Sequence, residues 1–372
     1  MKKTRKYFFI GLILLVFCFV VYLFMPFWLP ISVGILLAVS TSSLNRYFRR
    51  ITSDKNILSA TLTTFALIIL FLAPFMYAII KLAVHASSFD IGYINKTVDF
   101  IKNFDFHLPE AFASWEPRIK EFIASFDIAS IFKQGVSYLS SIGKSSAKFI
   151  FDLALIVVFY FFANIYGKFL IDFIKSTTPV ESEHIDSISN EVSNTMAVVL
   201  YSTIATAVLQ GFLFGVMIMF FGYDGFFMGI VYAFASMLPI VGGALVYIPI
   251  SIYEFSIGNR FEGFFILIYS VIMISTIADS FVKPLLIRFI NSKLVSNPAN
   301  INELIIFFAM IAGLSAFGFW GLILGPAIVT LFVACLNAYR LIISEEDKSL
   351  SSKKAEDINL INIKDDLIKD KI

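Results

Sequence analysis

The fold of this chain is decided by two stretches, LPIVGGALVYIP at residues 238–249 and AGLSAFGFWGLILGPAIV at residues 312–329. They form the centres of two strongly apolar segments, 226–257 and 302–340, which glycine and proline interrupt. A lipid-exposed helix gains nothing from such breaks, because each backbone group freed in hydrocarbon costs several kcal/mol unless protein or water satisfies it. Paired interruptions of this kind point to a transporter site. The pattern therefore favours a carrier over an anchored enzyme.

The composition indicates an all-α polytopic membrane protein whose main partner is the lipid bilayer. Hydrophobic residues make up 58% of the chain and charged residues 15%, with a mean hydropathy of +0.84. A soluble domain carries about 25% charged residues. The net charge of +2 gives no reason to expect a nucleic-acid partner. Cys18 and Cys335 lie far apart, and no histidine clusters with a cysteine, so neither a disulfide framework nor a metal or other cofactor is expected.

Hydropathy predicts about six full spans in addition to the two interrupted segments. The N-terminal run after MKKTRK resembles a signal peptide, but it is long and lacks a small-residue cleavage site, which favours an uncleaved first helix. Pro26 and Pro30 join the first two spans. The predicted spans are 7–25, 27–44, 57–84, 149–170, 197–221 and 261–282.

The distribution of Lys and Arg predicts the orientation and a fold for the interrupted segments. Arg46, Arg49 and Arg50 follow the second span and belong with the basic N-terminus in the cytoplasm. If 226–257 crossed the membrane once, Lys283 and the cations after it would fall outside. If each segment is instead a hairpin that enters and leaves on one side, these cations and both termini lie in the cytoplasm. The predicted location is the inner (plasma) membrane. Single broken spans remain the alternative.

Four regions follow from these assignments. Residues 1–84 hold the first three spans, and residues 148–340 form the transport core. Residues 85–147 alternate aromatic and aliphatic side chains with charges, which is typical of amphipathic helices at the outer membrane surface. A small soluble helical hairpin domain would show the same pattern. Residues 341–372 are a charged cytoplasmic tail, either disordered or a short surface helix.

Three motifs in order resemble those of the AI-2E family of bacterial transporters. They are LPIVGGALVYIP at 238–249, DSFVKPLLI at 279–287 and AGLSAFGFWGLILGPAIV at 312–329. The resemblance covers about 197–340 well and the earlier helices by layout. It implies a polytopic carrier that exports the autoinducer-2 signal in some members and exchanges cations for protons in others. The family's Gly-Gln pair early in span five is replaced here by Tyr201, Ser202 and Thr203, so its role cannot be carried over.

The glycines and prolines of the two segments are the first candidates for a substrate path. Proline breaks a helix and glycine permits a tight turn, so half-helices that meet there present unpaired backbone groups to a polar solute or a cation. Small residues that let helices pack closely are the alternative interpretation, which suits Gly321 and Gly325 equally well. The candidates are Pro239, Gly242, Gly243 and Pro249 in the first segment and Gly318, Gly321, Gly325 and Pro326 in the second.

Polar side chains inside the spans are few, so each is a candidate. Gln210 lies in the middle of span five and could line a polar path. Asp279 and Lys283 share a helix face just before Pro284, either as a coupling carboxylate with its partner or as an interfacial pair. Glu254 and Glu262, with Arg260, are expected in a solvated loop. By this assignment no carboxylate lies near the middle of a membrane span, which weighs against an obligatory proton relay.

The sequence predicts a secondary transporter rather than an enzyme. It contains no nucleotide-binding domain or hydrolase motif, so transport must be passive or driven by an ion gradient. Export of a small polar signalling molecule such as autoinducer-2 is the first hypothesis. A monovalent cation/proton antiporter and a non-transporting membrane scaffold are the alternatives. The mechanism expected is alternating access, and the glycine-lined faces favour a homo-oligomer.

Overall fold

The computed structural model describes residues 2–87, 117, 128–178, 181–238, 241–294, 303–340 and 343. The described residues form helices and turns without a strand, and six helical stretches are long and apolar enough to cross a membrane. The prediction of an all-α membrane protein is confirmed. The helices are α1 (Lys2–Phe24), η1 (Met25–Phe27), α2 (Trp28–Ser40), α3 (Ser42–Ile51), α4 (Asn56–Leu67), η2 (Ile68–Leu72), α5 (Ala73–Ser87), α8 (Ile128–Thr177), α9 (Ser182–Met219), α10 (Gly225–Ser236), α11 (Ala244–Ser256), α12 (Arg260–Tyr269), η4 (Ser270–Val282), α13 (Lys283–Leu294), α14 (Glu303–Phe317) and η5 (Gly318–Trp320), with a last helix over 321–340.

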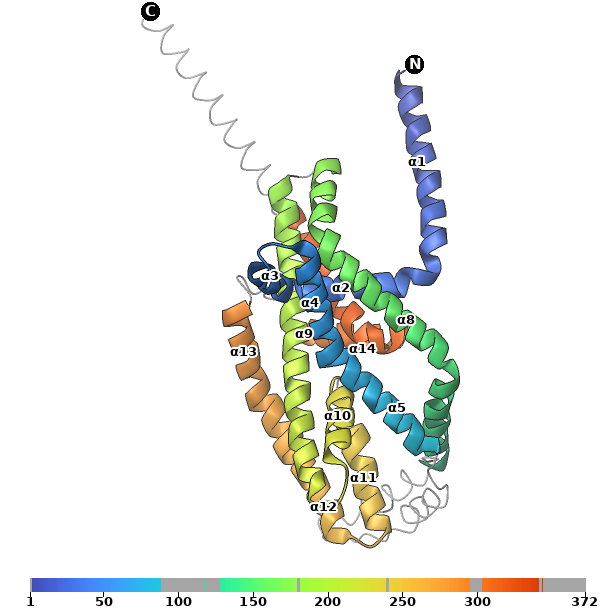
Figure 1. Cartoon of the computed structure of the whole chain (residues 1–372), viewed down its shortest axis with the longest axis vertical. Helices are drawn as coiled ribbons and strands as arrows, with labels where there is room; N and C mark the ends of the chain where they lie inside the picture. Colours follow the sequence, from blue (N-terminus) through green and yellow to red (C-terminus); the bar gives the residue numbers. More distant parts are fainter. Residues whose placement is uncertain are drawn as a thin grey trace, which may run out of the picture.

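The N-terminal helices differ in detail from the prediction of two spans. Tyr7–Ser40 is one apolar stretch, bent at η1, where Pro26 lies. In Figure 1, α1 stands apart from the other helices, and no residue of its most apolar window is buried. Lipid or a second protein must therefore cover α1. The predicted interfacial region 85–147 falls mostly outside the described residues, although its end, from Ile128, is helical and continues into α8.

One half of the molecule is a frame built from α2, α8, the first half of α9 and the helix over 321–340. Its core contains Val33 and Leu37 of α2 with Tyr160 of α8. Met196 and Leu200 of α9 complete the same cluster, together with Trp320 and Ile323. Because lipid is as apolar as these side chains, close packing rather than removal from water holds the cluster together. Apolar packing thus fixes the last helix to the frame.

A buried polar seam joins α2, α3, α4 and α8 within this frame. The Thr41 and Tyr160 hydroxyls lie 2.8 Å apart, and the Asn45 amide donates to the Asn164 carbonyl oxygen at 3.3 Å. Thr63 donates to the Asn45 side-chain oxygen at 3.2 Å. Interhelical hydrogen bonds of this kind hold membrane helices together where apolar burial gives little preference for one partner.

The other half of the molecule surrounds the second half of α9. Phe214 and Ile218 of α9 form a core with Tyr232 of α10, and Ile266 and Ile274 join it from α12 and η4. In Figure 1, α10, α11 and α12 occupy the lower end, whereas α14 lies near the middle. The helix α9 therefore runs through both cores and connects the two halves.

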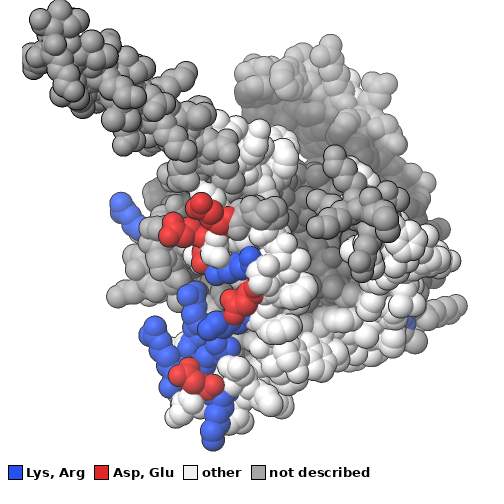
Figure 2. All heavy atoms as spheres, turned by 90° about the horizontal axis from the view of Figure 1, so that it is seen from above, with Lys and Arg blue, Asp and Glu red and all other residues white. Residues whose placement is uncertain are grey.

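Charge gathers at the end opposite to α12. The helix α3 carries Arg46, Arg49 and Arg50. Lys175, near the end of α8, forms an ion pair of 2.6 Å with Asp186, near the start of α9. The view from above in Figure 2 shows Lys and Arg side chains grouped on this end, with a few acidic ones among them. Large hydrophobic side chains are exposed along the long helices, as a lipid-facing surface requires.

Candidate functional site

The first interrupted segment folds back on itself as a helical hairpin. The half-helix α10 runs to Ser236, and α11 returns from Ala244. At the tip, a Cβ added to Gly243 would overlap the Tyr232 side chain, and the Gly242 amide donates to the Leu238 carbonyl at 3.1 Å. At the open end, the Tyr223 hydroxyl donates to Glu254. Contacts at both ends require antiparallel half-helices, which confirms the predicted hairpin.

The second interrupted segment also folds back, at η5. Gly318 has φ +63°, a left-handed conformation that glycine adopts without strain. A Cβ added to Gly321 would overlap the Gly313 carbonyl, and one added to Gly325 would overlap the Ala309 carbonyl. Residues so far apart in one helix could touch only if the chain reverses between them. The segment is therefore a second hairpin with backbone pressed against backbone.

The tips of the two hairpins meet at the ring of Phe75. Phe75 of α5 stacks on Phe319 of the second tip with ring centroids 5.2 Å apart, and it contacts Phe234 of the first hairpin at 4.9 Å. Phe71 contacts Phe234 at 5.4 Å from the π-helical segment η2. Short π-helical segments are common at functional sites. The interruptions thus converge at one place, which we call the tip junction (Phe71, Phe75, Phe234 and Phe319).

The predicted residues of the first segment lie along the first hairpin, from its turn into α11. Gly242 is buried in the turn, Gly243 lies beneath the Tyr232 ring, and Pro249 lies within α11. Pro239 is outside the described residues. Gln210 of α9 is buried. It lies about one helical turn after Ala207, which packs against Phe71 and Met237. Of the predicted polar side chains, Gln210 is therefore the nearest along the chain to a residue that packs at the tip junction.

The predicted residues of the second segment are mainly in packing positions. Gly321, Gly325 and Pro326 are buried, and both glycines face the backbone of α14. Gly318 is exposed at the turn. This is the close-packing contact that small residues allow. Their effect on the site is to shape the hairpin that carries Phe319.

The predicted Asp279–Lys283 pair lies away from the tips. Asp279 belongs to the π-helix η4, and its side chain is outside the described residues. Lys283 and Pro284 begin α13 and are exposed. The helix η4 packs against α9 and contributes Ile274 to the second core. The structure therefore does not bring this motif to the tip junction.

A glycine contact between α9 and α10 was not predicted. Gly211 and Gly215 face Gly229 and Gly225, and a Cβ on Gly229 would lie 2.7 Å from the Gly211 carbonyl oxygen. The signal was present as two Gly-x-x-x-Gly pairs, one in each helix. Beside this contact lies an apolar groove of about 430 Å³. Its walls include Leu70, Phe71, Pro74, Val208, Phe212, Val216, Phe234 and Met237, so it reaches the tip junction.

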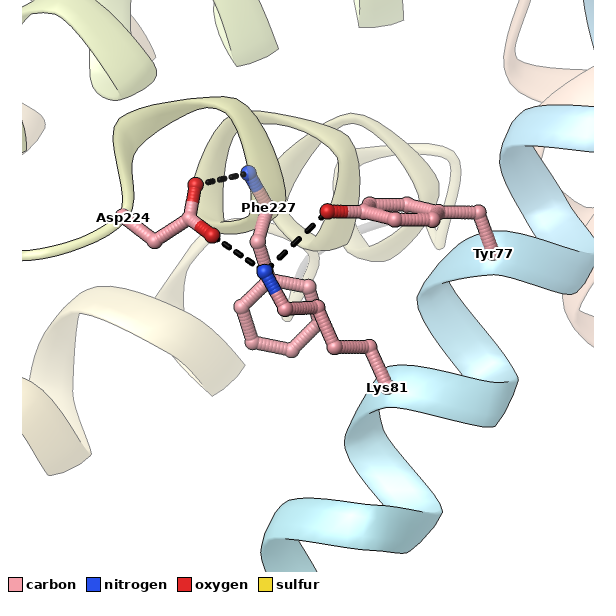
Figure 3. Close-up of polar contacts among 4 residues, drawn as sticks. All are labelled: Tyr77, Lys81, Asp224 and Phe227. Atoms are coloured by element: carbon pink, nitrogen blue, oxygen red, sulfur yellow. Dashed lines mark hydrogen bonds and ion pairs between the residues drawn. The ribbon is translucent and has the colours of Figure 1, made fainter.

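A polar cluster ties the open end of the first hairpin to α5, as Figure 3 shows. Lys81 forms an ion pair with Asp224 and a 3.1 Å hydrogen bond with the Tyr77 hydroxyl, and its ammonium lies 5.2 Å from the centre of the Phe227 ring. Asp224 also caps α10 by accepting from the Phe227 amide at 3.0 Å. The hydrogen bonds from Lys81 and then from this amide lower the pKa of Asp224.

The expectation of a solvated loop around Glu254 is wrong. Glu254 is 4% exposed, because α11 packs this face against α10 and α12. The Asn259 amide donates to its Oε2 at 2.8 Å, and the Tyr223 hydroxyl donates to Oε1. Burial, and then the hydrogen bond to Glu254, raise the pKa of Tyr223. Arg260 is exposed, as predicted, and forms no ion pair with Glu254.

Metal ligands are not grouped in the part of the chain that the structure describes, where no three His, Cys, Asp or Glu side chains come together. The site therefore consists of hairpin tips, an aromatic junction and a few buried polar groups.

Comparisons with known proteins agree with this architecture. The model of the family described as AI-2E family transporter matches residues 12–341. A protein of Helicobacter pylori J99 named as a transport protein is 33% identical over 345 residues, which is 92% of this chain and 98% of that protein. The corresponding protein of strain 26695 is 34% identical over 337 residues, covering 90% and 95%. A similarly named protein of Aquifex aeolicus is 29% identical over 210 residues, covering 55% and 54%.

Proposed function

Because this chain belongs to the AI-2E family of transporters, we propose that it is a secondary exporter of a small polar signalling molecule such as autoinducer-2. The chain is a membrane transporter by family, and the proposal concerns its substrate, direction and mechanism. The observation that carries it is the meeting of two hairpin tips on Phe75. Broken helices that meet at mid-depth are where transporters bind their substrates.

The proposed orientation follows from the basic end of the molecule. Arg46, Arg49 and Arg50 mark that end as cytoplasmic, together with both termini. The α10–α11 hairpin then enters from the outside of the inner membrane. The hairpin formed by α14 and 321–340 enters from the cytoplasm. Each tip closes one half of the path, and the tip junction separates the two solutions.

The proposed mechanism is alternating access. The two hairpins move with α9 and with the helix over 260–282 against the helices that precede them, and Phe75 of α5 parts from one tip at a time. Solute binds between the tips, where turn backbone and the buried amide of Gln210 offer hydrogen bonds. Ion or solute gradients drive the cycle. Self-association of the chain would cover the exposed helix α1.

The second candidate is a monovalent cation/proton antiporter. The buried carboxylate of Glu254 favours it, because ionisable groups inside membrane proteins mark proton and ion pathways. A scaffold without transport activity has no such observation in its favour.

Flux into proteoliposomes tests the proposal. Purified protein is reconstituted, and autoinducer-2, Na⁺ and K⁺ are followed separately with and without a pH gradient. We expect autoinducer-2 flux above that of protein-free liposomes. Cysteines replacing Phe75 and Phe319, joined by a short bifunctional reagent after Cys18 and Cys335 are removed, should stop it. The single-cysteine variants treated with the same reagent are the controls, and undiminished flux through the joined protein would contradict the mechanism.

A further inference from the structure

The carboxylate of Glu254 is buried without a cation. It lies near the end of α11, at the open end of the first hairpin, and is 4% exposed. Both of its oxygens accept hydrogen bonds from neutral donors, namely the Tyr223 hydroxyl and the Asn259 amide at 2.8 Å. Among the described residues it contacts no Lys, Arg or His side chain. This distinguishes it from nearby Asp224, which is half-exposed and paired with Lys81.

Burial makes the charged form of such a group costly. An ionised carboxylate removed from water is destabilised unless it is paired, and in practice it takes up a proton instead. Three groups on the surrounding elements carry charge: Asp224 is neutralised by Lys81, Arg260 is exposed, and Glu262 is partly exposed. The two neutral hydrogen bonds are thus the contacts that hold the Glu254 carboxylate in its buried position.

The network around Glu254 accepts either state without rearrangement of the backbone. A hydroxyl can donate or accept, so Tyr223 can turn its hydrogen away when Oε1 gains a proton. The protonated Oε1 then donates to the Tyr223 oxygen, while Oε2 keeps the Asn259 amide. A metal cation would have to displace one of these donors, and only one carboxylate is present. The geometry therefore suits a proton better than a metal ion.

Buried hydroxyls continue from Glu254 toward the hairpin tip. Ser251 lies one turn earlier on the same face of α11, is fully buried, and its Oγ has no hydrogen-bond partner among the described residues. Ser270 at the start of η4 has the same properties. Tyr247 is one further turn along α11. Unpaired buried hydroxyls are costly, and water is their usual partner.

We propose that Glu254 is a protonation site that couples transport to the proton gradient, with Tyr223 and Asn259 as positioning residues. A proton from the outer solution binds Oε1, which changes the charge of the hairpin from −1 to zero at this site. The same proton leaves toward the hairpin tip, along the buried hydroxyls of α11, when the tip opens to the cytoplasm. This inference rests on the proposed function as a secondary transporter.

Infrared difference spectroscopy tests the proton site independently of any substrate. Spectra of the full-length protein in lipid are recorded between acidic and neutral pH. The wild type should show a carboxyl C=O band that Glu254→Gln removes. Glu262→Gln, eight positions along the chain and less buried, should retain it. Tyr223→Phe should keep the band but move its midpoint. An unchanged band in Glu254→Gln would overturn the proposal.

Proton flux tests the coupling. Proteoliposomes enclosing a pH-sensitive dye are given a Na⁺, K⁺ or autoinducer-2 gradient. We expect Glu254→Gln to reduce proton movement to the level of protein-free liposomes, while Glu262→Gln resembles the wild type. If the variant still moves protons as the wild type does, the coupling role is wrong. If the wild type moves none of the probes, the proposed function fails, whereas the infrared band still decides the proton site.

Discussion

The two hairpins use glycine in opposite ways. The first presses its glycines outward, so that Gly225 and Gly229 of α10 meet Gly215 and Gly211 of α9. The second presses them inward, so that Gly321 and Gly325 meet Gly313 and Ala309 of its own partner half-helix. The first hairpin is therefore one unit with α9. The second is closed on itself and docks to the frame through Trp320, Ile323 and Leu324.

The open ends of the hairpins differ as well. The first is held by polar contacts, the Lys81–Asp224 pair and the Glu254 network, which a change of protonation or hydration can loosen. The second has a large buried apolar face and a side-chain hydrogen bond from Asn337 to Glu191 at 3.0 Å. Apolar burial does not respond to a proton. We infer that the first hairpin is the more mobile of the two and that its movement responds to a proton.

The largest effect is expected from filling the glycine contact inside the second hairpin. Gly325→Ala places a methyl group onto the Ala309 carbonyl, which is backbone and cannot turn aside. Overpacking of this kind costs about 1–3 kcal/mol or more. Thermal unfolding in detergent should show a large drop in midpoint. Gly167→Ala, with no atom within 4 Å of the added Cβ, is the matched control and should be neutral or slightly stabilising. Equal unfolding midpoints for the two variants would show that the glycine contact inside the second hairpin does not stabilise the protein.

A smaller effect is expected at the tip of the first hairpin. The Cβ of Gly243→Ala meets the far end of the Tyr232 side chain, which can shift, rather than a carbonyl group. The loss of stability should therefore be smaller than for Gly325→Ala. Because Tyr232 is buried against Phe214, its displacement should also reduce flux. Unfolding midpoints and flux of both variants in the same lipid check the order. A larger loss at Gly243 would reverse our assignment of the more rigid hairpin.

These contrasts show which parts of the molecule the sequence could predict. Both hairpins were predicted. Proline and glycine break the helix locally, and the number of membrane crossings must bring the Lys and Arg residues to the cytoplasmic side. The role of Gly321 and Gly325 stayed open between a binding surface and a packing surface, since both need a small residue. Burial of Glu254 could not be read from a charged neighbourhood such as EFSIGNRFE, because it depends on how α11 meets α10 and α12. The tip junction could not be predicted for the same reason, because it depends on how α5 packs against the two hairpins.

Removal of the Phe75 ring should affect transport more than stability of the frame. Phe75→Ala eliminates the surface on which Phe319 and Phe234 meet. Replacing a buried Phe by Ala costs about 3–5 kcal/mol at a fully packed site, but here the two mobile tips can close the gap, so the loss of stability should be smaller than that of Gly325→Ala. We expect a protein that folds but leaks protons in both directions. Phe162→Ala, on an exposed face of α8, is the control. If Phe75→Ala does not leak protons, the barrier between the two solutions lies elsewhere than at the tip junction.

The smallest effect is expected at the ion pair between the first hairpin and α5. Lys81→Met and Asp224→Asn both remove the pair, but asparagine still caps α10, so the two variants should behave alike. Asp224→Ala also loses the cap and should be less stable by about 1 kcal/mol. If the pair restrains the first hairpin, both charge-removing variants should release it and raise the exchange rate between inward and outward states, measured by single-molecule fluorescence. Dissimilar rates would show that Lys81 acts on something other than Asp224.

The pH dependence of this ion pair sharpens the same comparison. The pKa of Asp224 is lowered by Lys81 and the Phe227 amide, so the folded carboxylate holds its charge below its ordinary pKa of about 3.9. Its contribution to stability is complete above that ordinary value and is lost as the pH falls through the lowered one. Between pH 5 and pH 8, therefore, the pair should not respond. A wild-type exchange rate that varies over that range, and becomes constant in Glu254→Gln but not in Asp224→Asn, would assign the pH response of the first hairpin to its buried carboxylate. The reverse pattern would assign it to the ion pair.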